Sequence, residues 1–471
     1  MQKIIKRDGR VMPFAAAQIT EAIWKAAQAV GGEDQGMAQT VTKEVIETLE
    51  QTFEKSHYPT VEQVQDLVEK ILIEKGHAKT AKAYILYRHK RTEKRRLQEK
   101  LIGSPTKIPL SLEGLKAFEK EFHETPEEIF QKTAHSLSNN KKEETIFYNL
   151  LANLEFLPHP HILKNANKEK LSFLFHEFII PTNEILFEHL KNADLLLQNN
   201  CSISINLDQT DKPASLLKLF QSTSELSSKL NQKQSQHLAT ISPNHPSLLD
   251  VLTLKNDEKN HFEILQTEDE PNVLPKSHLK AEAYEPIALG WINLTVVAPE
   301  KISEIANKAA LFLNRVFEKS TYPLSLIQEK AKNKRCSLGI MGLAEVLYTQ
   351  NIDYISYEAG VFLQNIQGKI SKIETNLTSN ALIANLFDTT DGTEPFSKQS
   401  HLEKIAIKQG FHSPKLMTAI LKAGSLKPFD KEIPENIRKL VFTAQDLNSL
   451  PRQHRPLQEK DLRKVEKWVT T

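Results

Sequence analysis

The sequence predicts a helix-rich α/β fold organised in several domains. The chain has 471 residues, of which 39% are hydrophobic, which is enough to bury cores in two or three domains. The stretch IIKRDGRVMPF, residues 4–14, is typical of a short hairpin, and the residues after it carry apolar side chains at helical spacing. These patterns predict a first unit in which one hairpin packs on about four helices.

The hairpin is predicted from its turn residues. Residues 4–5 and 11–12 are expected to form the strands, and Asp8-Gly9 a two-residue turn with positive φ. The basic residues around this turn are Lys6, Arg7 and Arg10. Taken alone, such a turn is typical of a solvated surface hairpin, so its interpretation depends on the rest of the unit.

Four helices are expected after the hairpin. Apolar residues recur at helical spacing in 19–27, and a second helix covers roughly 36–55. Thr60 is predicted to cap the third helix, with Gln63 completing a capping box. The fourth helix begins in KTAKAYILYRHKR and continues into basic residues, so the unit ends near residue 95.

Composition excludes several kinds of site. The formal charge of +2 is near balance, so an acidic ligand must be met by a local basic patch. Cys201 and Cys336 are the only cysteines and form no CxxC pair, which argues against a zinc ribbon, an iron–sulfur site or a disulfide framework; we expect no metal. Cys201 is expected to be a small buried residue. The Gly-rich phosphate loops GxGxxG and GxxxxGK[ST] are absent.

The start MQKIIKRDGR has no apolar region of the kind found in signal peptides, and no run reaches about 18 apolar residues, so we expect neither a signal peptide nor a membrane span. A cytoplasmic location follows as the default expectation.

Residues 1–95 resemble the ATP-cone, a nucleotide-binding regulatory domain found in many ribonucleotide reductases. KRDGRVMPF, the following helix, PTVEQVQDLVEKIL and AKAYILYRHKR occur in the order and spacing of that family. The resemblance implies a purine nucleoside triphosphate, ATP or dATP, bound as an effector under the hairpin. The residues that it points to are Ile4 near the base, Lys6, Arg7, Asp8 and Gly9 in the hairpin, Thr60 and Gln65 along the pocket, and Arg88, Lys90 and Arg91 at the polyphosphate. One departure is the run Ala15-Ala16-Ala17, where such domains often carry an acidic residue.

The rest of the chain resembles the ribonucleotide reductase large subunit, closest to the adenosylcobalamin-dependent class. Five blocks in family order carry the resemblance, and the strongest is residues 335–359, in which LGIMGLA, residues 338–344, matches the family nearly throughout. The implied fold is a degenerate, truncated ribonucleotide-reductase-type α/β barrel. We expect the ATP-cone at 1–95, a helical region of reductase type at 96–207 and the barrel region at 208–471.

The chain departs from the family at the positions that correspond to its catalytic residues. The radical cysteine and its two partner residues, an asparagine and a glutamate, correspond to Lys276, Leu274 and His278, and the two redox cysteines to Leu174 and Ile287. Lys276 and His278 could act together as proton-accepting groups, but a solvated loop is the preferred interpretation. The family's phosphate loop is expected between Phe387 and Gly392 but is shortened to DTT, and no further barrel strands are expected after Leu447. Such a barrel leaves strand edges that a partner chain would cover.

Three functions follow from these observations. The first is a regulator that binds ATP or dATP and has lost the chemistry, a pseudoenzyme for which we expect no adenosylcobalamin. The second is an active adenosylcobalamin-dependent ribonucleoside-diphosphate reductase, and the third is a scaffold without a ligand. Expected partners are a second copy of the chain or a full-length reductase. Nucleic acid is not expected, because the zinc ribbon that accompanies the cone in transcriptional repressors is absent.

Overall fold

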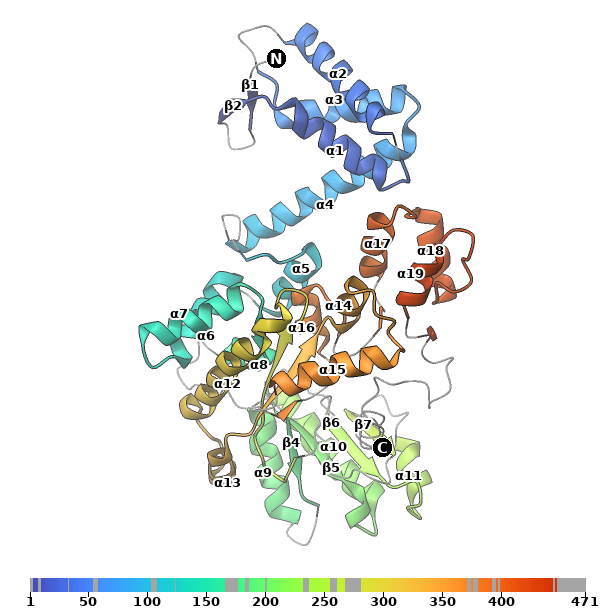
Figure 1. The fold of residues 1–471 in the computed structure, drawn as a ribbon. Coiled ribbons are helices and arrows are strands. Elements are labelled where there is room, and N and C mark those ends of the chain that lie inside the picture. Colours follow the sequence, from blue (N-terminus) through green and yellow to red (C-terminus); the bar gives the residue numbers. More distant parts are fainter. Residues whose placement is uncertain are drawn as a thin grey trace. The chain divides into compact units, whose positions relative to one another are not determined.

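The computed structural model describes residues 3–6, 10–32, 34–53, 58–102, 108–122, 124–165, 177–182, 186–199, 201–231, 237–254, 261–266, 281–370, 374–375, 380–391, 395–396, 399–443 and 445–446. The chain divides into two compact units, one made of Met1–Pro105 and Pro395–Arg455 and the other of Thr106–Glu394 and Pro456–Thr471. Each unit has its own elements, which are labelled in Figure 1.

The first unit begins with an antiparallel hairpin of β1 (Lys3–Ile5) and β2 (Val11–Pro13). Its register pairs Ile4 with Met12, and the Lys6 amide donates a hydrogen bond of 2.8 Å to the Arg10 carbonyl. Asp8-Gly9, for which a two-residue turn was predicted, lies outside the described residues.

Four helices follow the hairpin, as predicted. They are α1 (Ala16–Gln28), α2 (Gln35–Thr52), α3 (Val61–Glu74) and α4 (Ala78–Ile102). The predicted capping box is confirmed: the Gln63 amide donates to Thr60 Oγ1 at 3.2 Å, and the Thr60 amide donates to Gln63 Oε1 at 2.8 Å. The Ile5 amide donates to the Pro59 carbonyl at 2.9 Å, which fixes the hairpin to the start of α3. The core between these helices contains Ile23, Val41, Val45, Leu49, Val68, Ile71 and Leu72.

The same unit contains three further helices late in the chain. They are α17 (Gln399–Lys408), α18 (Pro414–Ala423) and α19 (Glu435–Leu440). Ser413 caps α18, accepting a hydrogen bond from the Leu416 amide at 3.1 Å, and Gly424 ends it with φ of 66°.

Helices lead into the second unit. They are α5 (Leu112–Glu121), α6 (Pro126–Leu137), α7 (Lys141–Ala152) and α8 (Pro160–Asn165). Thr125 and Glu128 form a capping box at the start of α6, and α6 packs against α7.

One sheet of the second unit is fully parallel. Its strands lie in the order β4 (Glu177–Ile180), β5 (Ser202–Asn206), β6 (His237–Ile241) and β7 (Phe262–Gln266). The helices connected to this sheet are α9 (Leu186–Gln198), α10 (Pro213–Asn231) and α11 (Leu248–Thr253), and a 3₁₀ turn, η1 (Leu207–Gln209), follows β5. The segment 208–237 is rich in polar residues and contains α10. Its buried Ser224 hydroxyl lies 2.7 Å from His237 Nε2, so part of that polarity faces inward.

The other sheet has the order β10-β9-β8-β3. Its strands are β3 (Phe156–Pro158), β8 (Ala288–Asn293), β9 (Cys336–Met341) and β10 (Glu374–Thr375), of which β3 alone is antiparallel to its neighbour. Its connections contain the 3₁₀ turns η3 (Pro299–Lys301) and η4 (Ala331–Asn333) and the helices α12 (Ile302–Lys319), α13 (Ser325–Lys330), α14 (Leu343–Thr349), α15 (Tyr357–Ile370) and α16 (Ala381–Phe387). Helix α12 packs against β8 and β9 (Figure 1).

The block that carried the reductase resemblance forms β9 and the turn into α14. Gly342 separates the two elements with φ of 81°, and a Cβ at this position would lie 2.6 Å from Thr295 Cγ2. Only glycine combines this backbone conformation with the close approach of Thr295. In the part of the chain that the structure describes, the two sheets are separate ladders of four strands each.

Candidate functional site

A cavity of about 760 Å³ lies in the first unit between the hairpin and helices α1, α3 and α4. The residues that line it are Ile4, Lys6, Arg10, Met12, Phe14, Ala15, Gln18, Ile19, Ala22, Val61, Val64, Gln65, Tyr84, Tyr87, Arg88 and Arg91. We call it the hairpin cavity.

Part of the wall of the hairpin cavity is apolar. Ile4 and Met12 are direct cross-strand partners, so both side chains lie on the same face of the hairpin. Phe14, Val61 and Val64 add apolar surface from β2's end and from α3. A flat apolar ring fits such a wall, while its edge would meet the amide side chains that also line the cavity.

The polar part of the lining is strongly cationic. Four of the lining side chains are basic, and none is a carboxylate. Lys6 and Arg10 come from the two arms of the hairpin and Arg88 and Arg91 from α4, so the positive charge comes from two elements. The Arg91 guanidinium lies 5.7 Å from the centre of the Tyr87 ring, a cation–π distance. This lining is suited to a ligand with an apolar ring and several negative charges.

Two carboxylates hold Arg88. Its Nη1 donates to Asp66 Oδ1 at 2.6 Å and to Glu69 Oε1 at 2.8 Å, both on α3. Burial lowers the pKa of Arg88, but the hydrogen bonds to Glu69 and Asp66 outweigh burial and raise it. Arg88 is therefore a permanently charged link between α3 and α4 at the edge of the cavity.

The hairpin cavity brings together part of the predicted site. Ile4, Lys6, Gln65, Arg88 and Arg91 line it. Thr60 does not line it; its side chain caps α3 and its backbone forms a bridge with Ile5. Arg7, Asp8, Gly9 and the side chain of Lys90 lie outside the described residues.

Sequence reasoning missed several lining residues of the hairpin cavity. They include Arg10, Met12, Phe14, Gln18, Tyr84 and Tyr87. The spacing of Tyr84, Tyr87, Arg88 and Arg91 was a usable signal, because positions i, i+3, i+4 and i+7 share one face of a helix.

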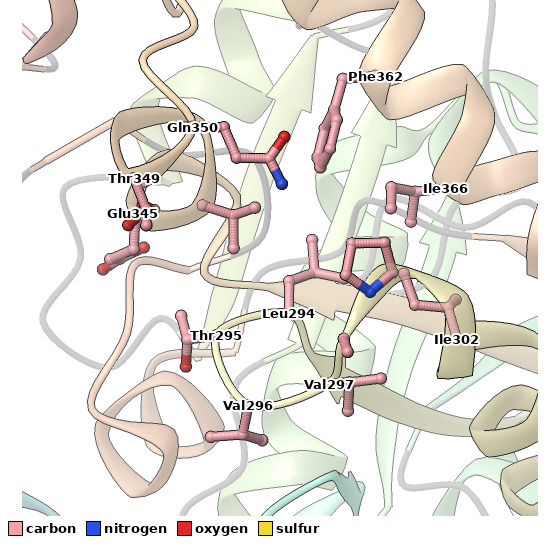
Figure 2. A pocket seen from close by; sticks show the side chains of 13 residues that line it. Leu294, Thr295, Val296, Val297, Ile302, Glu345, Thr349, Gln350, Phe362 and Ile366 are labelled. Carbon is pink, nitrogen blue, oxygen red and sulfur yellow. The ribbon is translucent and has the colours of Figure 1, made fainter.

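A second cavity, of about 340 Å³, lies in the second unit where β8 and β9 end (Figure 2). Leu294, Ile302, Phe362 and Ile366 form its apolar part, with Gln350 among its polar groups. Its lining contains neither a basic residue nor a cysteine. The Glu345 carboxylate that lines it accepts from the Thr390 amide at 2.7 Å and from the Thr390 hydroxyl at 2.6 Å. The hairpin cavity is therefore the better site for an anion.

Four of the five positions that correspond to the family's catalytic residues lie outside the described residues: Leu174, Leu274, Lys276 and His278. Ile287 is fully buried directly before β8. The two cysteines are free and buried, as expected for Cys201, and burial raises the pKa of each thiol to about 12.

Among the residues that the structure describes, no helix combines the length and apolar character that crossing a bilayer requires. These residues also contain no group of three or more His, Cys, Asp or Glu side chains arranged to hold a metal ion.

Comparison with protein families assigns two parts of the chain. Residues 2–93, which contain the hairpin cavity, match the ATP cone domain. Residues 287–424 match the barrel domain of ribonucleotide reductase. The ATP-cone domain that was predicted from the hairpin and its helices is thereby confirmed.

Similar proteins agree with both assignments. A vitamin B12-dependent ribonucleoside-diphosphate reductase of Mycobacterium tuberculosis is 23% identical over 99% of this chain and 89% of its own length. A protein of the same name from Thermoplasma acidophilum is 22% identical over 81% of this chain and 71% of its own. These names give no support to the expectation that adenosylcobalamin plays no part.

A solved structure shares the fold. The alpha subunit of the class Id ribonucleotide reductase of Actinobacillus ureae matches 75% of this chain and 85% of its own with a TM-score of 0.54, at 13% identity. The helix-rich α/β fold with a reductase barrel region is thus shown, and the chain belongs to the ribonucleotide reductase large-subunit family, with an ATP-cone domain at residues 2–93.

Proposed function

We propose that this protein binds ATP or dATP in the hairpin cavity as a regulatory effector and does not itself reduce ribonucleotides. The observation that carries the binding part is the lining of the hairpin cavity, where an apolar wall adjoins cations from the hairpin and from α4. The proposal also places the end of the ATP-cone near residue 95 and the start of the barrel region after residue 207.

The triphosphate would lie against Lys6, Arg10 and Arg91. Hydrogen bonds between charged groups of this kind are each worth about 1.5–3 kcal/mol, so several of them select a polyphosphate over a single phosphate. The purine would pack on the apolar wall that contains Ile4 and Val64. Arg7, Asp8, Gly9 and Lys90 remain candidates for further contacts.

The loss of catalysis is proposed from the cysteines. The family reaction needs a cysteine that becomes a radical and a pair that supplies electrons, whereas this chain has two cysteines in all. Cys201 precedes β5 and Cys336 begins β9, so they belong to different sheets, and neither lines either cavity. Both thiols are buried and stay protonated at neutral pH, which removes them from thiol–disulfide exchange.

The second candidate is an active reductase that depends on adenosylcobalamin. It is favoured by the printed names of relatives that match almost the whole chain. Neither of the two cavities described above has a cysteine in its lining on which a radical could be formed, so neither fits that cofactor's chemistry. We therefore derive no reaction step through adenosylcobalamin.

Regulation would act on a partner rather than on chemistry in this chain. A nucleotide that binds one assembly of chains more tightly than another shifts the population toward the tighter-binding assembly. The size of the shift is set by the difference between the two binding affinities. A second copy of this chain or a full-length reductase is the proposed partner.

Titration calorimetry of the full chain with MgATP and MgdATP tests the proposal, together with a turnover assay that contains adenosylcobalamin, a dithiol and each ribonucleoside diphosphate. Saturable binding without turnover is expected. Turnover above the blank would establish the second candidate, and the absence of binding at millimolar nucleotide would remove the regulatory function.

A further inference from the structure

The second cavity, at the ends of β8 and β9, has a polar side and an apolar side. Figure 2 shows Thr295, Glu345 and Thr349 along one side, and apolar side chains, among them Phe362 and Ile366, along the opposite side. Its volume of about 340 Å³ lies within the usual range for small-molecule sites, and ligands commonly bind outside the carboxyl ends of parallel strands. The second cavity therefore suits a small molecule with one polar end and an apolar body.

The two threonines on the polar side have already used their hydroxyl hydrogens. The Thr295 hydroxyl donates to Asn293 Oδ1 at 2.7 Å, and the Thr295 amide donates to the same oxygen at 3.0 Å, which fixes the orientation of the Asn293 amide group. The Thr349 hydroxyl donates to the Glu345 carbonyl at 2.8 Å. Each hydroxyl oxygen keeps lone pairs that can accept, so both threonines meet a ligand as hydrogen-bond acceptors.

Glu345 adds a further acceptor and a negative charge. Thr390 holds its carboxylate in place, donating from its amide at 2.7 Å and from its hydroxyl at 2.6 Å. The two oxygens of a carboxylate offer about four acceptor positions, so the contact with Thr390 does not prevent a further hydrogen bond. Among the described residues that line the cavity, Glu345 alone carries a charge, so the polar side is anionic.

A primary ammonium group matches this polar side. It carries one positive charge and three N–H donors, and a charge-assisted hydrogen bond to a carboxylate is stronger than one between neutral groups. An anionic ligand would be repelled by Glu345 and would find no donor on the threonines. The amide of Gln350 carries both a donor and an acceptor, so it excludes neither kind of ligand.

We propose that the second cavity binds a small organic amine, with its ammonium group at the Glu345 carboxylate and its apolar body against Phe362. This site goes beyond the proposed function. The hairpin cavity belongs to the other compact unit, so the proposal does not depend on nucleotide binding.

Titration of the full chain with phenethylammonium chloride, followed by saturation-transfer NMR, tests the site. Two comparison compounds each lack one feature: 2-phenylethanol has a hydroxyl in place of the ammonium group, and methylammonium has no apolar body. Phenethylammonium is expected to bind about tenfold or more tightly than 2-phenylethanol, the range of one charge-assisted hydrogen bond. Methylammonium should show no saturable binding, because it buries almost no apolar surface.

Two variants locate the bound amine. Glu345→Gln keeps the shape of the side chain and removes its charge, so it should weaken phenethylammonium binding about tenfold or more. Glu358→Gln is the matched control, because Glu358 is exposed on α15 and does not line the cavity. Val346→Phe, at a partly exposed lining position on α14, fills the cavity and should abolish binding, and it replaces Glu345→Gln if that variant does not fold.

Equal binding of phenethylammonium and 2-phenylethanol would overturn the proposal, because the acceptors would then contribute nothing to recognition. Unchanged phenethylammonium binding in Glu345→Gln or in Val346→Phe would also overturn it, since the amine would lie elsewhere on the protein. If phenethylammonium does not bind, the cavity is not an amine site. Each of these results leaves nucleotide binding in the first unit untouched, so the two proposals fail separately.

Discussion

Lys6 and Arg10 are joined across the hairpin by a hydrogen bond of 2.8 Å from the Lys6 amide to the Arg10 carbonyl, and both side chains line the hairpin cavity. The backbone thus brings together two cations that are separated by the turn. An anion bound in the cavity would meet both of these cations as well as those of α4.

Replacing either hairpin cation should weaken nucleotide binding. Lys6→Ala or Arg10→Ala removes one charge-assisted contact with the phosphates and should cost about 1.5–3 kcal/mol of binding free energy. Titration calorimetry measures the change. Lys43→Ala is the control, because Lys43 is exposed on α2, pairs with Glu47 and does not line the cavity. An equal loss in the control would mean that overall charge, rather than the cavity, governs binding.

How well the sequence predicted this site depends on how far apart along the chain the interacting residues lie. The capping box of Thr60 and Gln63 spans three residues and was predicted correctly. The pairing of Arg88 with Asp66 and Glu69 connects residues 22 and 19 positions apart on two helices, and no local pattern specifies it. The reductase resemblance likewise singled out the block that forms β9 and contains Gly342, but it did not predict the strand. The lining of either cavity depends on how separate elements pack.

Arg88 should act through the charges that it neutralises. Arg88→Ala leaves Asp66 and Glu69 without a cation beside the cavity, and two bare carboxylates repel a triphosphate. We expect ATP binding to fall by about tenfold or more, the effect of about 1.4 kcal/mol or more, and to recover in part in the double variant Arg88→Ala/Glu69→Gln. Affinities from calorimetry form the double-mutant cycle. If the double variant binds no better than Arg88→Ala, the guanidinium contacts the ligand directly.

No ribonucleotide should be reduced by this chain. Neither Cys201 nor Cys336 lines the hairpin cavity or the second cavity, and Lys276, which stands where the resemblance places the family's radical cysteine, offers no thiol. Lys276→Cys alone should not restore turnover, because a reducing pair would still be missing. Chromatographic detection of deoxyribonucleotides in the presence of adenosylcobalamin and dithiol decides this. A product signal from the wild-type protein would refute the pseudoenzyme proposal.

Acid should destabilise the second unit through Glu143. Its carboxylate accepts two hydrogen bonds from Arg315, at 2.7 and 3.2 Å, which join α7 to α12, and these bonds lower the pKa of Glu143. A carboxyl with a lowered folded-state pKa stabilises the fold above its unfolded pKa, and this contribution disappears as the pH falls through the folded value. The melting temperature should therefore fall on acidification below about pH 4.5.

Glu143→Gln identifies that contribution. The variant should melt at a lower temperature than the wild-type protein at pH 7 and show a smaller further loss between pH 5 and the acid limit. Glu47→Gln on α2 is the control, since Glu47 is exposed and its contact with Lys43 is 3.9 Å long. Parallel melting curves for Glu143→Gln and wild type over the whole pH range would contradict the assignment.

Nucleotide should change the assembly state. The cavity lies between the hairpin and α4, so a ligand there bridges two elements and fixes their relative position. The face of the unit that carries Ile85 and Leu86 on α4 is exposed, by 40% and 52%, and lies on the same helix as the cations that would hold the phosphates. A partner chain that contacts this face would meet any change in α4 that nucleotide binding causes. Nucleotide then favours the assembly to which it binds more tightly, by the difference in affinity.

Light scattering after size exclusion, with ATP, with dATP and without nucleotide, should give different masses for this protein alone or mixed with a full-length reductase. Constant mass in all three conditions, without co-elution, would separate nucleotide binding from assembly and leave the cone without a regulatory output.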